Sequence, residues 1–372
     1  MNKKKILTII LIILFIGFVA ERINTNKSDV YEEQNKISIK KKKNMLSMNL
    51  EQTAGAGDYK IVTQSSWPTE GYEFNTELSR CEKGSELSWD DTKKAVIMQG
   101  NVSDKCYVYF DLIPSMTLAE YVISQYTGVQ GENGIYYHNS SLENGAGDNS
   151  YRYAGASNNV NNYICLGSDA TTCPDANLFR IIGVFGDQTK VIRAKSVGDQ
   201  KWNTSKANAW SSSSLNTYLN GEYLTNLGTL ADKIATTTWK VGGGSSTYLY
   251  DVPTTAYQYE VGSSASTTTY EAKIGLMYAS DYGFAASSSA WTTKLSSYSS
   301  NTSKNWLYLG SYEWTISRYS GGTTGAFVVG GSGGVGSDAV TSSCAARPSF
   351  NLESSVKYVS GSGTIENPIR IN

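Results

Sequence analysis

The first feature along the chain is an apolar run over residues 6–20, broken only by Thr8 and preceded by three lysines at positions 3–5. A basic flank and an apolar helix are typical of an exported protein. Fifteen residues cover roughly 22 Å, less than the ~30 Å hydrocarbon core of a bilayer. Length therefore fits a short membrane anchor or a cleavable signal peptide, and a buried core helix is the third alternative. We favour an uncleaved anchor over residues 1–20, because Phe18 occupies the −3 position for cleavage after Ala20, where a small residue is needed.

The hydrophobic pattern then stops. Residues 21–56 are polar and include four consecutive lysines at positions 40–43, so we interpret them as a basic linker. The lysine run is a solvated spacer or, alternatively, a segment attracted to anionic wall polymers or headgroups just outside the membrane. A basic flank at the start of the chain predicts a single-pass orientation in which the rest of the chain is extracellular.

A period-two pattern begins at residue 57. Residues 86–89 and 95–98 are β-prone and flank an Asp-rich turn, which predicts a hairpin, and residues 106–110 form another aromatic and β-branched strand. Four or so short strands predict a small all-β, sandwich-like module over residues 57–114. Its expected role is a stalk that lifts the next domain away from the membrane.

The remaining residues, 115–372, combine the two-residue hydrophobic period of strands with the 3.6-residue period of helices. Thr117 and Glu120 have the spacing of a capping box, which predicts a helix that ends before Gly128. A long irregular loop is expected over residues 130–162, with His138 as a plain surface residue. Further predicted elements are a hairpin from 178–185 and 190–194, short helices capped by Ser213 or Ser214, over 231–235 and after Ser280, a buried strand over 273–278, and strands over 306–309, 313–316, 326–329 and 347–352. This order predicts an α+β fold.

The distribution of charge along the chain narrows the classes of function that the protein can have. Residues 1–50 carry ten Lys/Arg and four Asp/Glu, and the rest carries 22 and 29, which gives +6 and −7 for the two parts. A body with an acidic excess argues against nucleic-acid binding, because contact with phosphates needs a basic surface.

Five cysteines accompany the export signal. In an oxidising compartment, the local pairs Cys81–Cys106 and Cys165–Cys173 are the expected disulfides, and five reduced thiols are the alternative. The remaining Cys344 is interpreted as a buried small residue, an intermolecular bridge or a reactive thiol.

Four segments carry a family resemblance. Residues 178–185 (LFRIIGVF), 306–310 (WLYLG), 347–352 (RPSFNL) and 361–369 (GSGTIENPI) together resemble a C-terminal domain family of surface proteins from gut Firmicutes and their relatives. That family is similar to C-type-lectin-like domains, the fold of formylglycine-generating enzymes and of variable binding proteins. The resemblance covers roughly residues 115–372 and implies a lectin-like head. Cys344-Ala345 departs from the aromatic residue and Gly that are common there, and the lone late cysteine argues against formylglycine-generating activity.

In variable proteins of this fold the late part builds the ligand face, so the resemblance implies a binding role for an aromatic-rich stretch. The candidate ligand-binding residues are Trp306, Tyr308, Tyr312, Trp314, Arg318 and Tyr319. Tyr, Ser, Gly and Asn are also the residues of adaptable binding surfaces. The alternative is that alternating aromatics in strands belong to the core, most of all Trp306 and Trp314.

Catalytic patterns are mostly missing. The sequence contains no nucleophile elbow and no P-loop, and its one histidine weakens any mechanism that needs several imidazoles. No catalytic residue, cofactor or metal site is predicted. Calcium stays open, because Asp148 with Asn149, and Asp169 with Asp175, offer oxygen ligands in loops.

We therefore expect a membrane-anchored, extracellular bacterial surface protein that binds a host glycan, mucin or another cell, without enzymatic activity. The alternatives are an enzyme that acts on surface polysaccharide, which needs two carboxylates about 5–9 Å apart, and a structural subunit of a surface appendage.

Overall fold

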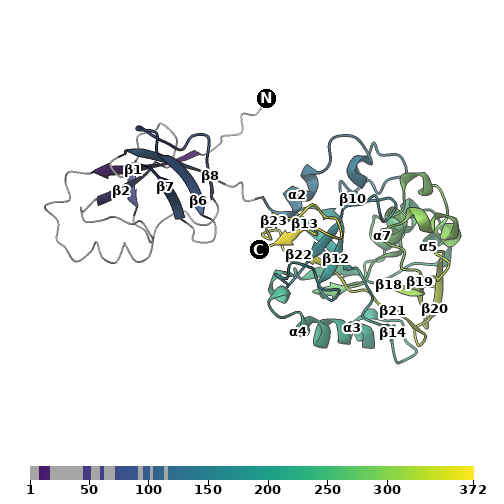
Figure 1. The fold of residues 1–372 in the computed structure, drawn as a ribbon. Coiled ribbons are helices and arrows are strands. Elements are labelled where there is room, and N and C mark those ends of the chain that lie inside the picture. Colours follow the sequence, from purple (N-terminus) through teal and green to yellow (C-terminus); the bar gives the residue numbers. More distant parts are fainter. Residues whose placement is uncertain are drawn as a thin grey trace. The chain divides into compact units, whose positions relative to one another are not determined.

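The computed structural model describes residues 8–16, 45–51, 59–62, 72–90, 95–100, 104–112 and 116–372. The chain divides into two compact units, Met1–Ser115 and Met116–Asn372 (Figure 1). The described residues form a mixed α and β structure with many strands and few, short helices. None of the helices in these ranges has the length and apolar character needed to cross a membrane.

The first unit pairs a sheet with a separate hairpin. The sheet has the order β3-β2-β1-β8-β4, with β5 also paired to β8, and the hairpin is β6–β7. The strands are β1 (Thr8–Ile16), β2 (Met45–Glu51), β3 (Tyr59–Val62), β4 (Tyr72–Phe74), β5 (Arg80–Cys81), β6 (Glu86–Asp90), β7 (Ala95–Gln99) and β8 (Cys106–Leu112). The β6–β7 hairpin is the one that the sequence predicts.

The core of this unit is small. Alternate residues of β8, Cys106, Val108 and Phe110, are buried with Phe74, as the period-two pattern requires. The Trp89 ring of the hairpin packs edge-on against Phe110 at 5.5 Å. Cys81 and Cys106 lie directly opposite each other on β5 and β8 and form the predicted disulfide.

The apolar run at the start of the chain differs from its prediction. Thr8–Ile16 is the strand β1, which pairs antiparallel with β2 and β8, and not a helix. The remaining residues of the predicted anchor and most of the predicted linker lie outside the described residues. Within that linker Met45–Glu51 forms the strand β2, so this part is not the plain spacer that the sequence predicts. Six of the nine residues of β1 are Ile or Thr, whose β-branched side chains favour extended backbone. A short apolar run does not distinguish a helix from a buried strand by periodicity alone.

The second unit contains two larger sheets. The first has the order β17-β22-β13-β12-β10-β9, with β11 also paired to β12, and the second has the order β14-β21-β18-β19-β20. The first sheet consists of β9 (Ile135–Tyr137), β10 (Tyr151–Tyr153), β11 (Tyr163–Cys165), β12 (Leu178–Phe185), β13 (Gln188–Arg193), β17 (Ile274–Gly275) and β22 (Ser349–Leu352). The second consists of β14 (Asp199–Lys201), β18 (Glu313–Arg318), β19 (Gly325–Val329), β20 (Val335–Ala339) and β21 (Ser343–Ala345).

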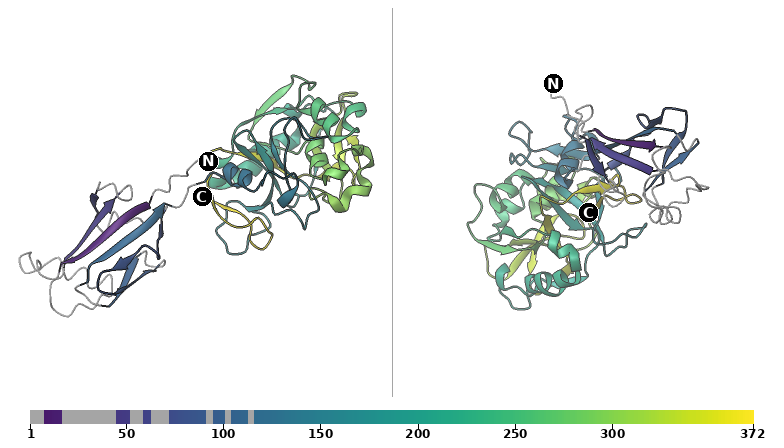
Figure 2. Two further views of the ribbon diagram at one scale, coloured as in Figure 1. Left: turned by 90° about the horizontal axis from the view of Figure 1, so that it is seen from above. Right: turned by 90° about the vertical axis from the view of Figure 1, so that its left-hand side faces the viewer.

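Short helices and two hairpins surround these sheets (Figure 2). The α-helices are α2 (Leu118–Ser124), α3 (Ser214–Tyr218), α4 (Leu224–Asn226), α5 (Ser246–Leu249), α6 (Pro253–Glu260) and α7 (Ala279–Phe284). The other helical turns are η3 (Glu132–Gly134), η4 (Trp210–Ser212), η5 (Leu219–Tyr223), η6 (Gly228–Lys233), η7 (Ser288–Ala290) and η8 (Leu295–Lys304). The hairpins are β15 (Thr237–Lys240) with β16 (Thr269–Ala272), and β23 (Tyr358–Ser360) with β24 (Arg370–Ile371).

Sequence motifs in this unit predict the structure correctly where all their residues lie close together in the chain. The hydroxyl of Thr117 accepts the Glu120 amide, and the Glu120 carboxylate accepts the Thr117 amide, which confirms the capping box of α2. The β12–β13 hairpin and the helix capped by Ser213 are also confirmed. Helix α7 begins before Ser280, with Tyr278 as its N-cap. Of the predicted strand over 273–278 only β17 forms, and residues 306–309 form a turn.

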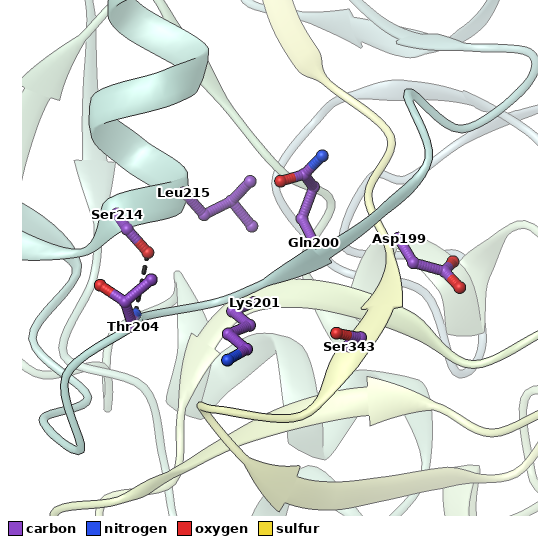
Figure 3. A pocket seen from close by; sticks show the side chains of 7 residues that line it. All are labelled: Asp199, Gln200, Lys201, Thr204, Ser214, Leu215 and Ser343. Carbon is purple, nitrogen blue, oxygen red and sulfur yellow. Dashed lines mark hydrogen bonds between the residues drawn. The ribbon is translucent and has the colours of Figure 1, made fainter.

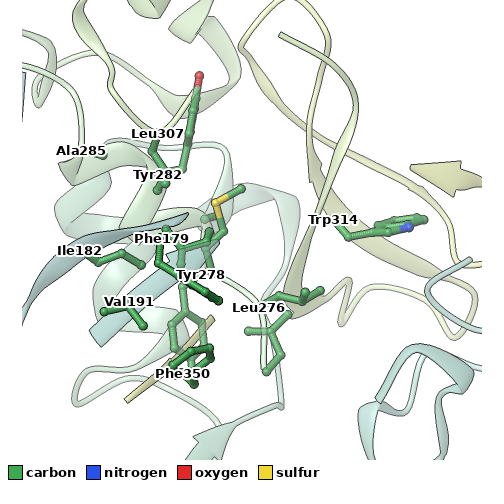
Figure 4. Packing of buried hydrophobic residues seen from close by; sticks show 14 of the residues in the cluster. Phe179, Ile182, Val191, Leu276, Tyr278, Tyr282, Ala285, Leu307, Trp314 and Phe350 are labelled. Atoms are coloured by element: carbon green, nitrogen blue, oxygen red, sulfur yellow. The ribbon is translucent and has the colours of Figure 1, made fainter. Parts of the chain in front are cut away.

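One apolar core runs through both sheets of the second unit. Figure 4 shows Phe179, Val191 and Phe350 close together, from the neighbouring strands β12, β13 and β22. The rings of Phe179 and Phe350 meet edge to face, with centroids 5.3 Å apart. Trp314 extends this core onto β18, so the second sheet is fixed against the first.

Candidate functional site

Two of the six predicted ligand-binding residues are core residues. Trp306 is 3% exposed and Trp314 is fully buried. The indole N–H of Trp306 donates to the carbonyl of Tyr153, and that of Trp314 donates to the carbonyl of Gln200, both at 2.8 Å. The polar atom of each ring is therefore satisfied inside the protein, and these two side chains do not reach a surface ligand.

Strand β18 separates the other four candidates. Tyr308 and Tyr312 precede β18, and Arg318 and Tyr319 lie at its far end. Six residues of strand at about 3.3 Å each place Tyr312 and Tyr319 roughly 20 Å apart. The 14-residue cluster in the sequence thus becomes two separate groups in the structure.

The group at the start of β18 surrounds the glycine-rich turn between β19 and β20. The Tyr308 hydroxyl donates to the carbonyl of Gly331 at 2.5 Å. Tyr312 is 57% exposed, and its ring lies over the same turn, since a Cβ atom added to Gly331 would lie 3.6 Å from the ring. Tyr312 is the most exposed of the six candidates.

The group at the end of β18 is held by a neighbouring loop. Arg318 donates its Nε to the carbonyl of Gly242 at 2.9 Å, and its own carbonyl accepts the amide of Gly244 at 3.2 Å. Gly243 between them has φ +60°, and a Cβ there would lie 1.9 Å from the Arg318 carbonyl oxygen. Only glycine fits this close approach.

A buried amide fixes the turn that follows Tyr319. The Nδ2 of Asn208 lies 2.9, 3.1 and 2.8 Å from the carbonyl oxygens of Tyr319, Gly322 and Gly325. The main-chain N–H of Asn208 also donates to the Thr323 carbonyl, at 2.9 Å. The turn between β18 and β19 is therefore ordered without help from a ligand.

Two tyrosines flank one buried phenylalanine beside this turn. The rings of Tyr250 and Tyr319 pack edge-on against Phe327, with centroids 5.7 and 5.9 Å away. The hydroxyls of Tyr250 and Ser337 lie 3.1 Å apart. We call Arg318, Tyr319, Tyr250, Ser337 and the loop over residues 242–244 the Arg318 surface. Of these, the sequence pointed to Arg318 and Tyr319; Tyr250 and Ser337 come from distant segments and carry no local signal.

A separate hollow of about 300 Å³ opens beside β14. Figure 3 shows Gln200 and Leu215 on one side of β14 and Lys201 with Ser343 on the other. Its remaining lining residues are Asp199, Thr204 and Ser214, and the Ser214 hydroxyl accepts the Thr204 amide at 2.9 Å. The hollow offers hydroxyl, amide and single opposite charges, which suits a neutral polar ligand better than a strongly charged one.

His138 is not the surface residue that the sequence predicts, because it is fully buried. Its Nδ1 accepts the Ala146 amide at 3.0 Å, and its ring packs against Phe284 and Trp291. Burial, with a smaller contribution from the Arg152 charge, lowers the pKa of His138 to about 2. A buried imidazole with so low a pKa is too weak a base to take a proton from a substrate.

The buried charges of the second unit are ion-paired or hydrogen-bonded within the protein. Asp281 lies 2.5 Å from Lys190 and 3.6 Å from Arg152, and Arg152 pairs with Asp148 at 2.5 Å. Burial raises the pKa of Glu260, whose carboxylate accepts the amides of Ala279 and Ser280 at the start of α7. These carboxylates fix the fold and are not directed at a substrate.

Two of the three aspartates that left calcium open, Asp148 and Asp175, have charged protein partners. Burial raises the pKa of Asp148, but Arg152 and two bonds from Ser150 outweigh it and lower the pKa to about 2. Asp175 pairs with Lys195 at 2.5 Å. Within the described ranges, the one group of three potential metal ligands is Cys81, Asp104 and Cys106, and its two sulfurs are joined in a disulfide.

The cysteines follow the expected pairing. Cys81–Cys106 and Cys165–Cys173 are disulfides, and Cys344 is a free, buried thiol. Burial raises the pKa of Cys344 to about 12, so the thiol stays protonated. This environment favours the first of the three interpretations of Cys344, a buried small residue.

Comparison with known proteins adds no relative: no protein-family model matches the chain, and neither the curated proteins nor the solved structures contain a match. The functional argument therefore depends on the geometry of this chain.

Proposed function

We propose that this protein is an extracellular bacterial surface protein that binds a glycan through the Arg318 surface. Export is supported by the two disulfides, which persist in oxidising compartments, and by the basic and apolar start of the chain. In the anchored form, Thr8–Ile16 would leave β1 and enter the bilayer as a helix, so the strand and the anchor are alternative states of one segment. A lectin-like head belongs to the same proposal and is supported by the α+β architecture.

The convergence of Arg318, Tyr319 and Tyr250 on a turn that is already ordered carries the proposal. The Nε of Arg318 is used by Gly242, and its terminal nitrogens have no hydrogen-bond partner among the described residues. A guanidinium fork binds pairs of oxygens, and tyrosine rings offer apolar faces with a polar edge. Vicinal hydroxyls and the apolar face of a sugar ring present the complementary groups.

Pre-organisation supports the same surface. The Asn208 bonds and the Gly243 contact hold the surface in place before a ligand arrives, which lowers the entropy lost on binding. The two rival functions have less support in the described residues. None of the residues that define the Arg318 surface is a carboxylate, whereas a polysaccharide-cleaving enzyme would need a pair of them at its site. An appendage linked through Cys344 needs an accessible thiol, and Cys344 is buried.

The test is binding of the full-length chain, solubilised in mild detergent, to a glycan and mucin array with and without calcium. We expect saturable binding that falls at least tenfold in Arg318→Met and Tyr319→Ser. Tyr312→Ser is the control, because it removes a more exposed tyrosine at the opposite end of β18.

Either of two results would overturn the proposal. One is a folded, monomeric protein that binds no glycan in either condition. The other is binding that is lost in Tyr312→Ser and kept in Arg318→Met, which would move the ligand to the other end of β18.

A further inference from the structure

A second cleft, of about 570 Å³, lies at the C-terminal hairpin of the second unit. Its walls are the loop closed by the Cys165–Cys173 disulfide, the end of η6, and the segment that joins β23 to β24. Figure 2 shows the yellow C-terminal segment at one end of the second unit, and the hydrogen bonds of Arg370 place the disulfide loop beside it. The volume falls within the roughly 300–1,000 Å³ of small-ligand sites.

Three hydrogen bonds from Arg370 fix the disulfide-loop wall of this cleft. Arg370 donates to the carbonyls of Ser168 and Ala170 at 2.7 Å each, and to that of Thr171 at 3.3 Å. Together with the disulfide, this guanidinium fixes a loop that contributes little to the core, since Asp169, Ala170 and Thr171 are exposed.

The opposite wall is fixed by glycines of the segment singled out in the sequence (GSGTIENPI). Gly361 has φ +95°, and a Cβ there would lie 2.2 Å from the Pro368 carbonyl oxygen. Gly363 has φ +80°, and its Cβ would lie 2.3 Å from the Asn161 carbonyl oxygen. The hydroxyls of Tyr121 and Tyr358, whose rings stack at 3.8 Å, both donate to the Gly361 carbonyl. These contacts hold this wall of the cleft in place before a ligand arrives.

Besides Arg370, whose guanidinium is bound to the loop carbonyls, three charged side chains line the cleft. Lys233 is half-buried on η6, and Asp169 and Glu366 are exposed on the two stapled walls. None of the three forms an ion pair with a residue that the structure describes. The apolar Leu230 and Pro368, both largely buried, also line the cleft. Beside Arg370, the cleft thus offers one cation and two anions without ion-pair partners, together with an apolar part of its lining.

We infer that this cleft binds a short peptide with a free amine and a free carboxylate. The amine is placed at Asp169 and Glu366, the carboxylate at Lys233, and an apolar side chain at Leu230 and Pro368. Opposite charges that face a ligand fix its direction and register more than they raise its affinity. This site does not depend on the Arg318 surface, and the two ligands differ in class.

The test uses the immobilised full-length chain and two pools of tetrapeptides, one with free ends and one N-acetylated and C-amidated, with retained peptides identified by mass spectrometry. We expect the free-ended pool to be retained at least tenfold more strongly than the capped pool. Lys233→Met and the double variant Asp169→Asn/Glu366→Gln each reduce retention at least tenfold. Unfolding temperatures should stay unchanged, because these side chains are not paired in the fold.

Two controls separate this inference from the glycan proposal. Arg318→Met keeps peptide retention. Cys165→Ser/Cys173→Ser lowers it, because the loop wall of the cleft is no longer held by a disulfide. Equal retention of the two pools, retention unaffected by the charge variants, or preferential retention of amino-sugar oligosaccharides such as chitosan fragments would overturn the inference, whatever the glycan array shows.

Discussion

The two units reach stability by different means. The described core of the first unit consists of Phe74, Cys106, Val108 and Phe110, and one of these four residues is half of a disulfide. The second unit has a continuous apolar core through both sheets and buries whole ion pairs inside it. A small unit buries too little surface to depend on its core alone, whereas a large one can accommodate buried charges. We therefore expect covalent constraint to dominate in the first unit and buried pairing in the second.

The largest effect is expected from breaking the Glu313–Arg347 pair of the second unit. Arg347 donates to both Glu313 oxygens, at 2.6 and 2.8 Å, and to the Leu307 carbonyl. Arg347→Met should lower the free energy of unfolding by about 3–5 kcal/mol, because it leaves a buried carboxylate without its partner. Urea denaturation followed by tryptophan fluorescence measures it.

The double variant Glu313→Leu/Arg347→Met is the control and should regain most of this loss, since an apolar pair needs no neutralisation. The cost of Arg347→Met should also shrink as the pH falls. Without Arg347, burial raises the pKa of Glu313, so protonation at lower pH favours the folded state. A loss below about 1 kcal/mol would contradict the buried pairing.

The next effect tests the first unit. Cys81→Ser/Cys106→Ser should cost about 3 kcal/mol, because the bridge closes 25 residues of the unfolded chain. Calorimetry should show the transition of the first unit shifted and that of the second unchanged. Cys165→Ser/Cys173→Ser is the control within the second unit, and its eight-residue separation predicts a loss about 1 kcal/mol smaller. If both transitions move together in the first variant, the units do not unfold independently.

A third, smaller effect is a pH dependence confined to the second unit. The pKa of His138 is about 2 in the folded state and its model value is 6.5, so the unfolded chain takes up the proton first as the pH falls. The free energy of unfolding should drop by about 2 kcal/mol between pH 7 and pH 5. His138 is the only histidine of the chain, and His138→Gln should flatten the profile in this window. An unchanged slope in the variant would assign the dependence to buried carboxyl groups instead.

The smallest effect is expected at the surface. Lys195 and Asp175 pair at 2.5 Å, but their side chains are 65% and 66% exposed. Lys195→Ala should change the free energy of unfolding by less than about 1 kcal/mol, since water and salt screen an exposed pair. Denaturation curves at low and high salt measure this difference, and a loss that equals that of Arg347→Met would remove the distinction between buried and exposed pairs.

Sequence reasoning succeeds in this protein where a motif is complete within a few residues. The Thr117–Glu120 capping box and the β12–β13 hairpin are local, and both cysteine pairs join near neighbours. His138 fails because its loop is buried by Phe284 and Trp291, more than 140 residues away. The apolar start forms a strand in this structure because two strands of the same unit pair with it.

The candidate site shows the same limit. The aromatic stretch is real, but β18 separates its members, and Trp306 and Trp314 point into the core. Tyr250, Ser337 and the loop over residues 242–244 complete the Arg318 surface, and Asn208 holds the turn beside it. None of these residues is adjacent to Arg318 in the sequence. No local pattern predicts such a convergence, because it follows from the pairing order of the sheet.

The bonds that Asn208 makes determine how freely the sequence of the turn after Tyr319 can vary. Its bonds to the turn after Tyr319 all go to main-chain carbonyls, and residues 320–324 are exposed. Asn208 therefore fixes the main-chain path of the turn through bonds that do not depend on which side chains the turn carries. Replacing those side chains would leave the scaffold intact, so this turn is where the chain tolerates diversification, by evolution or in a designed library, with a new specificity as the result.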